Sequence, residues 1–289
     1  MHAIQYEAPT SLEQALGLLA AHGENARAIC GGTDIIIQLR AGTRRPDYLI
    51  DVKHISELTQ LSFDSATGLR LGAAVRCIEI HESQLMRRYY PGLCEAAHLI
   101  GSLQIQGRAS VGGNLCNGSP AADTTPALIA LGAVARIVGP KGERRVNVDE
   151  FVLSPGRTVM QPGELLIELL IAPPPAHSAD AYLRFIPRNE MDIAVVGVGA
   201  SVTLDGDRCV AARISLGAVA ATPLFAEKAS ASLIGKEMNT EAFDAAGDLA
   251  TALSSPIDDM RGTAEFRRHL VGVLTRRTLE IAVRRAQHN

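Results

Sequence analysis

The sequence predicts an α+β protein of about two domains, and three observations support this class. Its 289 residues are enough for about two domains of roughly 150 residues each. Patterns of strand and helix alternate over residues 1–54, as in an α/β unit. From residue 55 the patterns become those of antiparallel hairpins, and a proline run then marks a boundary near residue 176.

The N-terminal elements follow from capping and spacing signals. Residues 10–13 resemble a capping box, in which a hydroxyl and a carboxylate three residues later satisfy free amides at a helix start. The helix is expected to end at Gly23, because leucines recur at helical spacing up to this glycine. Short apolar runs predict strands at 26–30 and 48–52, with a helix opening near Asp34 between them.

The middle of the chain is expected to be mainly antiparallel. Turn sequences at 64–68 and 139–142 each separate two strand-like segments, which predicts two hairpins. A helical stretch is expected between the hairpins, near 83–100. Three consecutive prolines within 173–178 then indicate a linker.

The last block is predicted to hold a strand pair, at 193–204 and 209–218, and a final helix over about 264–286. The basic pairs of that helix fit either a surface for a partner or the solvated face of an ordinary amphipathic helix. These pairs are Arg267-Arg268, Arg276-Arg277 and Arg284-Arg285.

Composition excludes several classes of function. The 28 Lys and Arg balance 31 Asp and Glu, and there are few aromatic residues and no Trp, so nucleic-acid binding is not expected. No apolar run reaches the roughly 20 residues of a membrane span. The five cysteines are dispersed without a C-x-x-C pair, and no secretory signal precedes them, which indicates a cytoplasmic protein without a metal site of its own. No catalytic residue is expected.

Two glycine-paired segments resemble each other, one at 29–34 and the other at 110–114. Glycine lets backbone amides turn inward and approach a ligand closely, and successive amides form a concave nest for an anion. Two such nests could hold one extended anion, such as the pyrophosphate of a dinucleotide. Each pair alone is better explained as a simple tight turn, whereas the similarity of the two pairs favours a shared function.

The segment after the second glycine pair is rich in hydroxyl, amide and carboxylate groups. Asp123 could accept a hydrogen bond from a ribose hydroxyl or a flavin edge, or it could serve as a plain helix cap. Thr125 is the expected cap of the next helix, with Pro126 at its first position. The sequence Gly197-Val198-Gly199 begins like a dinucleotide fingerprint but lies in a strand-like context, so a Rossmann loop is not expected.

Four motifs in order along nearly the whole chain resemble the FAD-binding medium subunit of the molybdenum hydroxylases. This family includes subunits of carbon monoxide dehydrogenase-type and bacterial xanthine or aldehyde dehydrogenase-type enzymes. The motifs are Cys30-Gly31-Gly32-Thr33-Asp34, Ser110-Val111-Gly112-Gly113-Asn114 with Ser119-Pro120-Ala121-Ala122-Asp123, Arg188-Asn189-Glu190-Met191-Asp192-Ile193-Ala194, and Arg261-Gly262-Thr263-Ala264-Glu265-Phe266-Arg267.

The resemblance implies a two-lobed FAD-binding domain of the vanillyl-alcohol-oxidase (PCMH) type, with FAD between the lobes. This domain is expected over 1–176, with lobes at about 1–54 and 55–176. A small α+β domain with a three-stranded antiparallel sheet is expected over 177–289.

The same resemblance implies where the cofactor is held. The two glycine segments are expected to clamp the FAD pyrophosphate, and the region of Arg184 is expected to lie by the isoalloxazine, where a cation stabilises the reduced flavin. The expected cofactor-binding residues are Ile29, Cys30, Gly31, Gly32, Thr33, Asp34, Ile35, Ile100, Ser110, Val111, Gly112, Gly113, Asn114, Asn117, Ser119, Ala122, Asp123, Leu165, Leu166, Arg184, Arg188 and Ile193.

In function, the resemblance implies an electron-transfer subunit. A large molybdopterin subunit would hydroxylate the substrate, a small subunit would carry two [2Fe-2S] clusters, and electrons would pass through FAD in this chain to NAD, a quinone or oxygen. The complex would be a dimer of heterotrimers. Two alternatives remain open at this point, namely a stand-alone flavin enzyme and a non-catalytic binding or assembly module whose glycine turns are structural.

Overall fold

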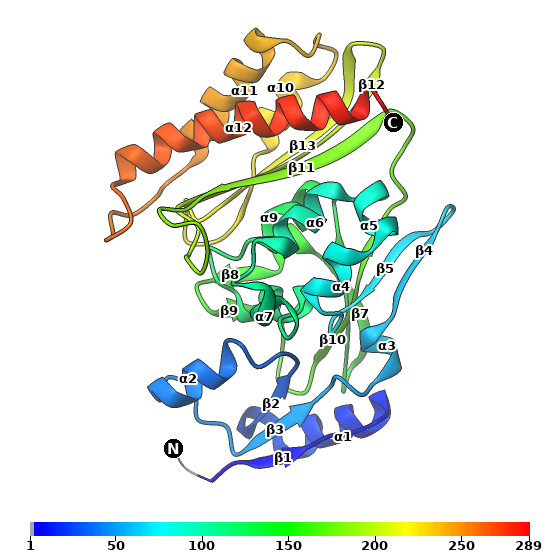
Figure 1. The fold of residues 1–289 in the computed structure, drawn as a ribbon. Coiled ribbons are helices and arrows are strands. Elements are labelled where there is room, and N and C mark those ends of the chain that lie inside the picture. Colours follow the sequence, from blue (N-terminus) through cyan, green and yellow to red (C-terminus); the bar gives the residue numbers. More distant parts are fainter. Residues whose placement is uncertain (1–2) are drawn as a thin grey trace.

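The computed structural model describes residues 3–289, and Figure 1 shows three main sheets stacked along the molecule, each with its own helices. A small parallel sheet lies at the N-terminal end, and a larger antiparallel sheet with short helices fills the middle. The C-terminal sheet, covered by the three last helices, lies at the other end. This combination of helices with mainly antiparallel sheets confirms the α+β class.

The first sheet has the strand order β1-β3-β2, and its strands are parallel. The cap of helix α1 lies one residue later than expected. The hydroxyl of Ser11, rather than that of Thr10, accepts a hydrogen bond from the amide of Gln14 at 3.2 Å. It ends at Gly23, which has φ +50°, as predicted. The elements are β1 (Gln5–Glu7), α1 (Leu12–His22), the 3₁₀ turn η1 (Gly23–Asn25), β2 (Ala26–Ile29), α2 (Ile35–Ala41) and β3 (Tyr48–Asp51).

The middle sheet has the order β4-β5-β10-β6-β7 and is antiparallel throughout, and it contains both predicted hairpins. Its strands are β4 (Leu61–Asp64), β5 (Gly68–Gly72), β6 (Val134–Gly139), β7 (Gly142–Asn147) and β10 (Leu165–Ile171). A two-stranded ribbon pairs β8 (Val152–Ser154) with β9 (Arg157–Thr158).

Short helices cover the inner face of this sheet and share its core. The helical stretch expected near 83–100 is confirmed and consists of two helices: α5 and α6 meet at Pro91, which lacks an amide and forces Tyr90 out of helical geometry, at φ −141° and ψ 56°. The helices are α3 (Ser56–Thr59), α4 (Cys77–Glu82), α5 (Gln84–Tyr89), α6 (Pro91–His98), α7 (Leu103–Gln106), α8 (Val111–Asn117), α9 (Thr124–Ala130) and the 3₁₀ turn η2 (Val148–Glu150).

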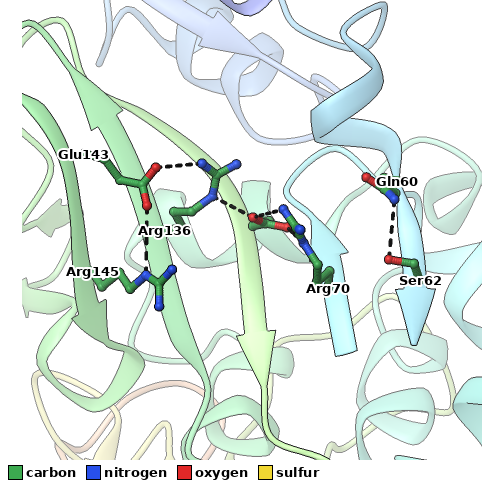
Figure 2. Close-up of polar contacts among 7 residues, drawn as sticks. Gln60, Ser62, Arg70, Arg136, Glu143 and Arg145 are labelled. Carbon is green, nitrogen blue, oxygen red and sulfur yellow. Dashed lines mark hydrogen bonds and ion pairs between the residues drawn. The ribbon is translucent and has the colours of Figure 1, made fainter. Parts of the chain in front are cut away.

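The outer face of the middle sheet carries a row of ion pairs across four strands, shown in Figure 2. Glu168 on β10 is 4% exposed and lies between two arginines. It accepts bonds from Arg70 on β5 at 2.8 Å and from Arg136 on β6 at 2.6 Å. Arg136 also pairs at 2.8 Å with Glu143 on β7, so the row ties the strands together.

Replacing Glu168 by Gln should lower the free energy of unfolding by about 2 kcal/mol, because two arginines then face each other without a carboxylate. Arg70 is 52% exposed, and the solvent there limits the effect. The control Glu143→Gln, whose side chain is 44% exposed, should cost less than about 0.5 kcal/mol. Urea unfolding of the two variants measures both values, and equal losses would contradict the assigned role of Glu168.

The C-terminal sheet has the order β11-β12-β13-β14, in which the three expected long strands are joined by a two-residue edge strand. Gly197 and Gly199 lie within β12, where glycine admits the hydroxyl of Tyr182 and the backbone of Pro126, so they form no dinucleotide loop. The elements are β11 (Ser178–Phe185), β12 (Val196–Asp205), β13 (Arg208–Gly217), β14 (Leu224–Phe225), α10 (Glu227–Leu233), α11 (Thr240–Leu253) and α12 (Ala264–Ala286), the last as predicted.

The basic pairs of α12 make contacts within the chain. Arg267 is buried and donates to the carbonyls of Val195 and Ala218, while Arg276 pairs with Asp244 at 2.9 Å. Arg285 forms an ion pair with Glu95 of α6. One arginine of each basic pair therefore binds groups of this chain, which favours an ordinary amphipathic helix over a surface for a partner.

The junction between the middle layer and the C-terminal sheet contains a buried carboxyl group. Asp180 of β11 is 3% exposed, and it accepts the amide of Leu93 at the start of α6, at 3.2 Å. Burial raises the pKa of Asp180 to about 7, and the nearby charge of Glu95 adds to this effect. The group is therefore neutral in the folded chain over a pH range where an unfolded Asp is ionised.

Folding stability should consequently fall as pH rises from about 4 to about 7, the interval between the unfolded and folded pKa values of Asp180. Within this pH interval the folded state binds more protons than the unfolded state. The free energy of unfolding therefore falls by up to about 1.4 kcal/mol per pH unit. Asp180→Asn removes this titration and keeps an acceptor for Leu93. Urea unfolding at pH 5 to 8 should show that the free energy of unfolding of the variant increases relative to that of the wild type as pH rises. A constant difference between the two over this pH range would contradict the assignment.

Candidate cofactor-binding site

A cavity of about 550 Å³ lies where the N-terminal lobe meets the middle lobe. Both glycine segments line it, and so do hydrophobic residues of β10. The structure thus brings together most of the predicted residues: Ile29, Cys30, Gly31, Gly32, Thr33, Asp34, Ile35, Ile100, Ser110, Gly112, Gly113, Asn114, Asn117, Leu165 and Leu166.

The first glycine segment lines this cavity and contains a series of unpaired backbone amides. It connects the end of β2 to the start of α2, and Gly32 adopts φ +80°, a conformation that favours glycine. Among the described residues, no acceptor is found for the backbone amides of Gly31, Gly32, Thr33 and Asp34. Successive free amides of this kind form a site for an anion.

The second glycine segment differs from the predicted tight turn. Ser110 caps α8 by accepting the amide of Gly113 at 3.1 Å, so Gly112 and Gly113 lie in the first turn of a helix. The amide of Gly113 is satisfied by this cap. The amide of Val111 faces the carbonyl of Val75 across the antiparallel bridge between Arg76 and Ser110, whereas no acceptor is found among the described residues for the amide of Gly112.

Close backbone packing explains two of the four glycines. A Cβ on Gly31 would lie 2.0 Å from the carbonyl oxygen of Arg108, and one on Gly112 would lie 2.5 Å from that of Ala73. At Gly31, the first glycine segment packs closely against the residues that precede the second glycine segment. Glycine at position 31 therefore allows the two glycine segments to approach each other, and glycine at position 112 allows α8 to approach Ala73.

Two hydrogen bonds join the lobes beside the cavity. Gln38 of α2 donates to the side chain of Asn117 on α8 at 2.9 Å, and Arg44 donates to the carbonyl of Gly156 at 3.2 Å. Within the middle lobe, Asn114 accepts the hydroxyl of Thr124 at 2.7 Å. Asn114 and Asn117 thus have their side-chain oxygens fixed by protein donors while both line the cavity.

Comparison with known proteins assigns the chain to a family. The family described as the FAD binding domain in molybdopterin dehydrogenase matches residues 2–174, and the CO dehydrogenase flavoprotein C-terminal domain matches residues 181–282. The chain belongs to this flavoprotein family. It is therefore an FAD-binding medium subunit of the molybdenum hydroxylase type, as the motifs predicted.

Individual relatives resemble this flavoprotein subunit over nearly its whole length. It is 34% identical to the carbon monoxide dehydrogenase medium chain of Afipia carboxidovorans, over 98% of both chains. It is 29% identical to the xanthine dehydrogenase FAD-binding subunit of Escherichia coli O157:H7, over 96% of this chain and 95% of the relative.

Solved structures agree with this assignment. Reconstituted CO dehydrogenase from Oligotropha carboxidovorans contains a chain with a TM-score of 0.94 and 32% identity, covering 98% of this chain and 99% of that one. Quinoline 2-oxidoreductase from Pseudomonas putida 86 gives a TM-score of 0.91 and 29% identity over 99% of both chains.

The residues of the flavoprotein subunit fit the cofactor that its family name implies. The diphosphate of FAD is an anion, and the four free amides from Gly31 to Asp34 supply donors for an anion. The volume of the cavity lies within the range of about 300–1,000 Å³ usual for ligand pockets. Asp34 also lines the cavity, and burial raises the pKa of its carboxyl group.

Several predicted residues of the flavoprotein subunit lie outside this cavity. Val111 is fully buried in the core, and Ala122 is buried as well. Arg188 and Ile193 lie on the loop between β11 and β12, where Ile193 is 53% exposed and Arg188 pairs with Asp192 at 3.4 Å. Those not lining the cavity are Val111, Ser119, Ala122, Asp123, Arg184, Arg188 and Ile193.

Asp123 and Arg184 form a buried ion pair at 2.6 Å, and the hydroxyl of Tyr182 donates to the same carboxylate at 2.9 Å. The predicted cap at Thr125 is wrong, since α9 begins at Thr124 and Asp123 occupies the cap position. The side chain of Asp123 makes no capping bond, so the plain-cap alternative is not observed either. Burial raises the pKa of Asp123 to about 6, although Arg184 opposes the shift.

Arginines of the cavity wall were missed at the level of sequence. Arg27 on β2, Arg44 after α2 and Arg157 on β9 all line the cavity. Burial lowers the pKa of Arg27, and the charge of Arg44 lowers it further. The three lie far apart in sequence, and the only local signal is the Arg44-Arg45 pair in the loop before β3.

Residues 3–289 contain neither a cluster of metal ligands nor a helix suited to a membrane. No group of three or more His, Cys, Asp or Glu side chains is placed to hold a metal ion. Within the same residues, no helix is long and apolar enough to cross a membrane.

Proposed function

We propose that this chain binds FAD in the cavity between its two lobes and passes electrons from [2Fe-2S] clusters of a partner subunit to an acceptor. The observation that carries this proposal is the run of four free amides on the cavity wall. It supports an anion site at the position where the family motif predicts the pyrophosphate. When bound, FAD supplies the capacity to take up electrons and pass them on.

The residues of the chain have separate tasks in this proposal. The amides of Gly31 to Asp34 bind the diphosphate, and Arg27 and Arg44 add positive charge beside it. Leu165 and Leu166 provide an apolar wall. The buried pair of Asp123 and Arg184 we place toward the flavin end, as the family motifs suggest.

The partners follow from family membership. We propose a large molybdopterin-binding subunit, a small subunit with two [2Fe-2S] clusters, and a dimer of such heterotrimers in the cytoplasm. The acceptor would be NAD, a quinone or oxygen. The FAD-binding domain would span 1–176 and the C-terminal domain 177–289, with the lobe boundary near residue 55.

The two alternative functions receive less support. The close packing of Gly31 and Gly112 is what a purely structural module would need, yet it leaves the free amides from Gly31 to Asp34 unexplained. For a stand-alone enzyme, the described cavity wall offers the carboxyl groups of Glu24, Asp34 and Glu164 as acids. Glu164 is held by Arg144 at 2.7 Å, which lowers its pKa and makes it a poor proton donor.

Purification of the chain with its genomic neighbours tests the proposal. The complex should contain one FAD per copy of this chain, and the flavin absorbance should bleach when the molybdenum subunit is given its substrate. A complex that turns over without any change in flavin absorbance would contradict the electron-transfer role. Turnover of an organic substrate by the isolated chain would instead favour the stand-alone enzyme.

A further inference from the structure

A polar cluster lies beside the first glycine segment, in which the buried carboxylate of Asp51 joins the partly exposed side chains of Tyr6 and Lys53. The parallel pairing of β2 with β3 aligns Ile29 with Asp51, so both strands end at the same edge of the sheet. The glycine segment leaves β2 at this edge, and Lys53 follows β3 there. The cluster is not part of the cavity wall.

The contacts of this cluster fix the ammonium group of Lys53 in one position. Its Nζ donates to Oδ1 of Asp51 at 2.5 Å and to the carbonyl of Cys30 at 3.0 Å. Asp51 is 1% exposed, and it also accepts the hydroxyl of Tyr6 and the amide of Lys53. Burial alone would raise the pKa of Asp51, but the bonds from Lys53 and Tyr6 outweigh it and leave this pKa lowered.

The bond to Cys30 determines how the next peptide group is oriented. In a planar trans peptide the carbonyl and the following amide point in opposite directions. Because Lys53 holds the carbonyl of Cys30 on the side of the cluster, the amide of Gly31 points to the other side. That amide is the first of the four free donors of the segment.

We infer that Lys53, held by Asp51 and Tyr6, is a positioning residue that aims the Gly31 amide at the diphosphate of the cofactor. This inference rests on the proposed binding of FAD in the cavity. Lys53 acts through the Cys30–Gly31 peptide and does not contact the cofactor itself.

Titration of the full-length apoprotein with FAD, followed by flavin fluorescence, tests the inference. Lys53→Met should weaken FAD binding on the order of tenfold, since a charged hydrogen bond that orients the site is lost. Lys53→Arg keeps a charged donor and should restore affinity to within about threefold. The matched control Lys228→Met, at an exposed position of α10 in the C-terminal part, should leave affinity unchanged.

A second readout separates positioning from general destabilisation. In amide NMR spectra of the apoprotein, the Gly31 signal should move in Lys53→Met and return in Lys53→Arg, because the donor to the Cys30 carbonyl polarises that peptide. If Lys53→Met fails to fold because Asp51 is left unpaired, the double variant Asp51→Asn, Lys53→Met removes both charges and should show the same loss of affinity.

The possible outcomes distinguish this inference from the proposed function. If the wild-type chain binds no FAD, the proposed function fails. If the wild type binds FAD and Lys53→Met binds it equally well with an unmoved Gly31 signal, only the role of Lys53 is overturned.

Discussion

Replacing Gly31 by Ala should weaken FAD binding about a hundredfold or more. The added Cβ would lie 2.0 Å from the carbonyl oxygen of Arg108, where no carbon atom fits. The first glycine segment must then move away from the chain leading into α8, and the anion site loses its shape. Overpacking of this kind also costs about 1–3 kcal/mol of stability.

The control for this variant is Gly17→Ala in α1. No atom lies within 4 Å of the Cβ that this substitution adds, and alanine is favoured over glycine in a helix by about 1 kcal/mol. Flavin fluorescence titrations and thermal unfolding should therefore show normal FAD affinity and unchanged or higher stability. Normal FAD affinity in Gly31→Ala would contradict the claim that close packing of the two segments builds the site.

Replacing Asp123 by Ala should lower the free energy of unfolding by about 3–5 kcal/mol, because it leaves a buried cation without its partner. The side chain of Arg184 is 4% exposed, and its Nε already lacks an acceptor. The hydroxyl of Tyr182 would lose its acceptor as well. At pH 7.5 the carboxyl group of Asp123 is ionised, since this pH lies above its pKa of about 6.

Two further variants check this explanation by urea unfolding. Tyr182→Phe removes only the neutral donor and should cost about 1 kcal/mol. The double variant Asp123→Ala, Arg184→Met removes both charges and should be more stable than Asp123→Ala alone. A double variant that is no more stable than Asp123→Ala alone would show that the ion pair is not what matters here.

Much of the fold follows from local signals in the sequence. Turn residues at 64–68 and 139–142 predicted both hairpins of the middle sheet, and the apolar spacing over 264–286 predicted the last helix. Some local details were missed. The helical stretch near 83–100 was predicted without the break that Pro91 imposes between α5 and α6.

The site could be predicted only as far as its contributions are contiguous in sequence. Both glycine segments were identified, but the second was expected as a turn, since a Ser cap followed by two glycines is also compatible with a loop. The arginines of the wall and the pairing of Asp123 with Arg184 depend on strands brought together by the tertiary fold. No spacing rule in the sequence could reveal them.

The structure of the chain with FAD bound, at a resolution that places the diphosphate, tests the proposed anion site most directly. We expect diphosphate oxygens within hydrogen-bond distance of the amides of Gly31 to Asp34, in the cavity between the N-terminal and middle lobes. A diphosphate bound elsewhere, with these four amides facing only solvent, would contradict it.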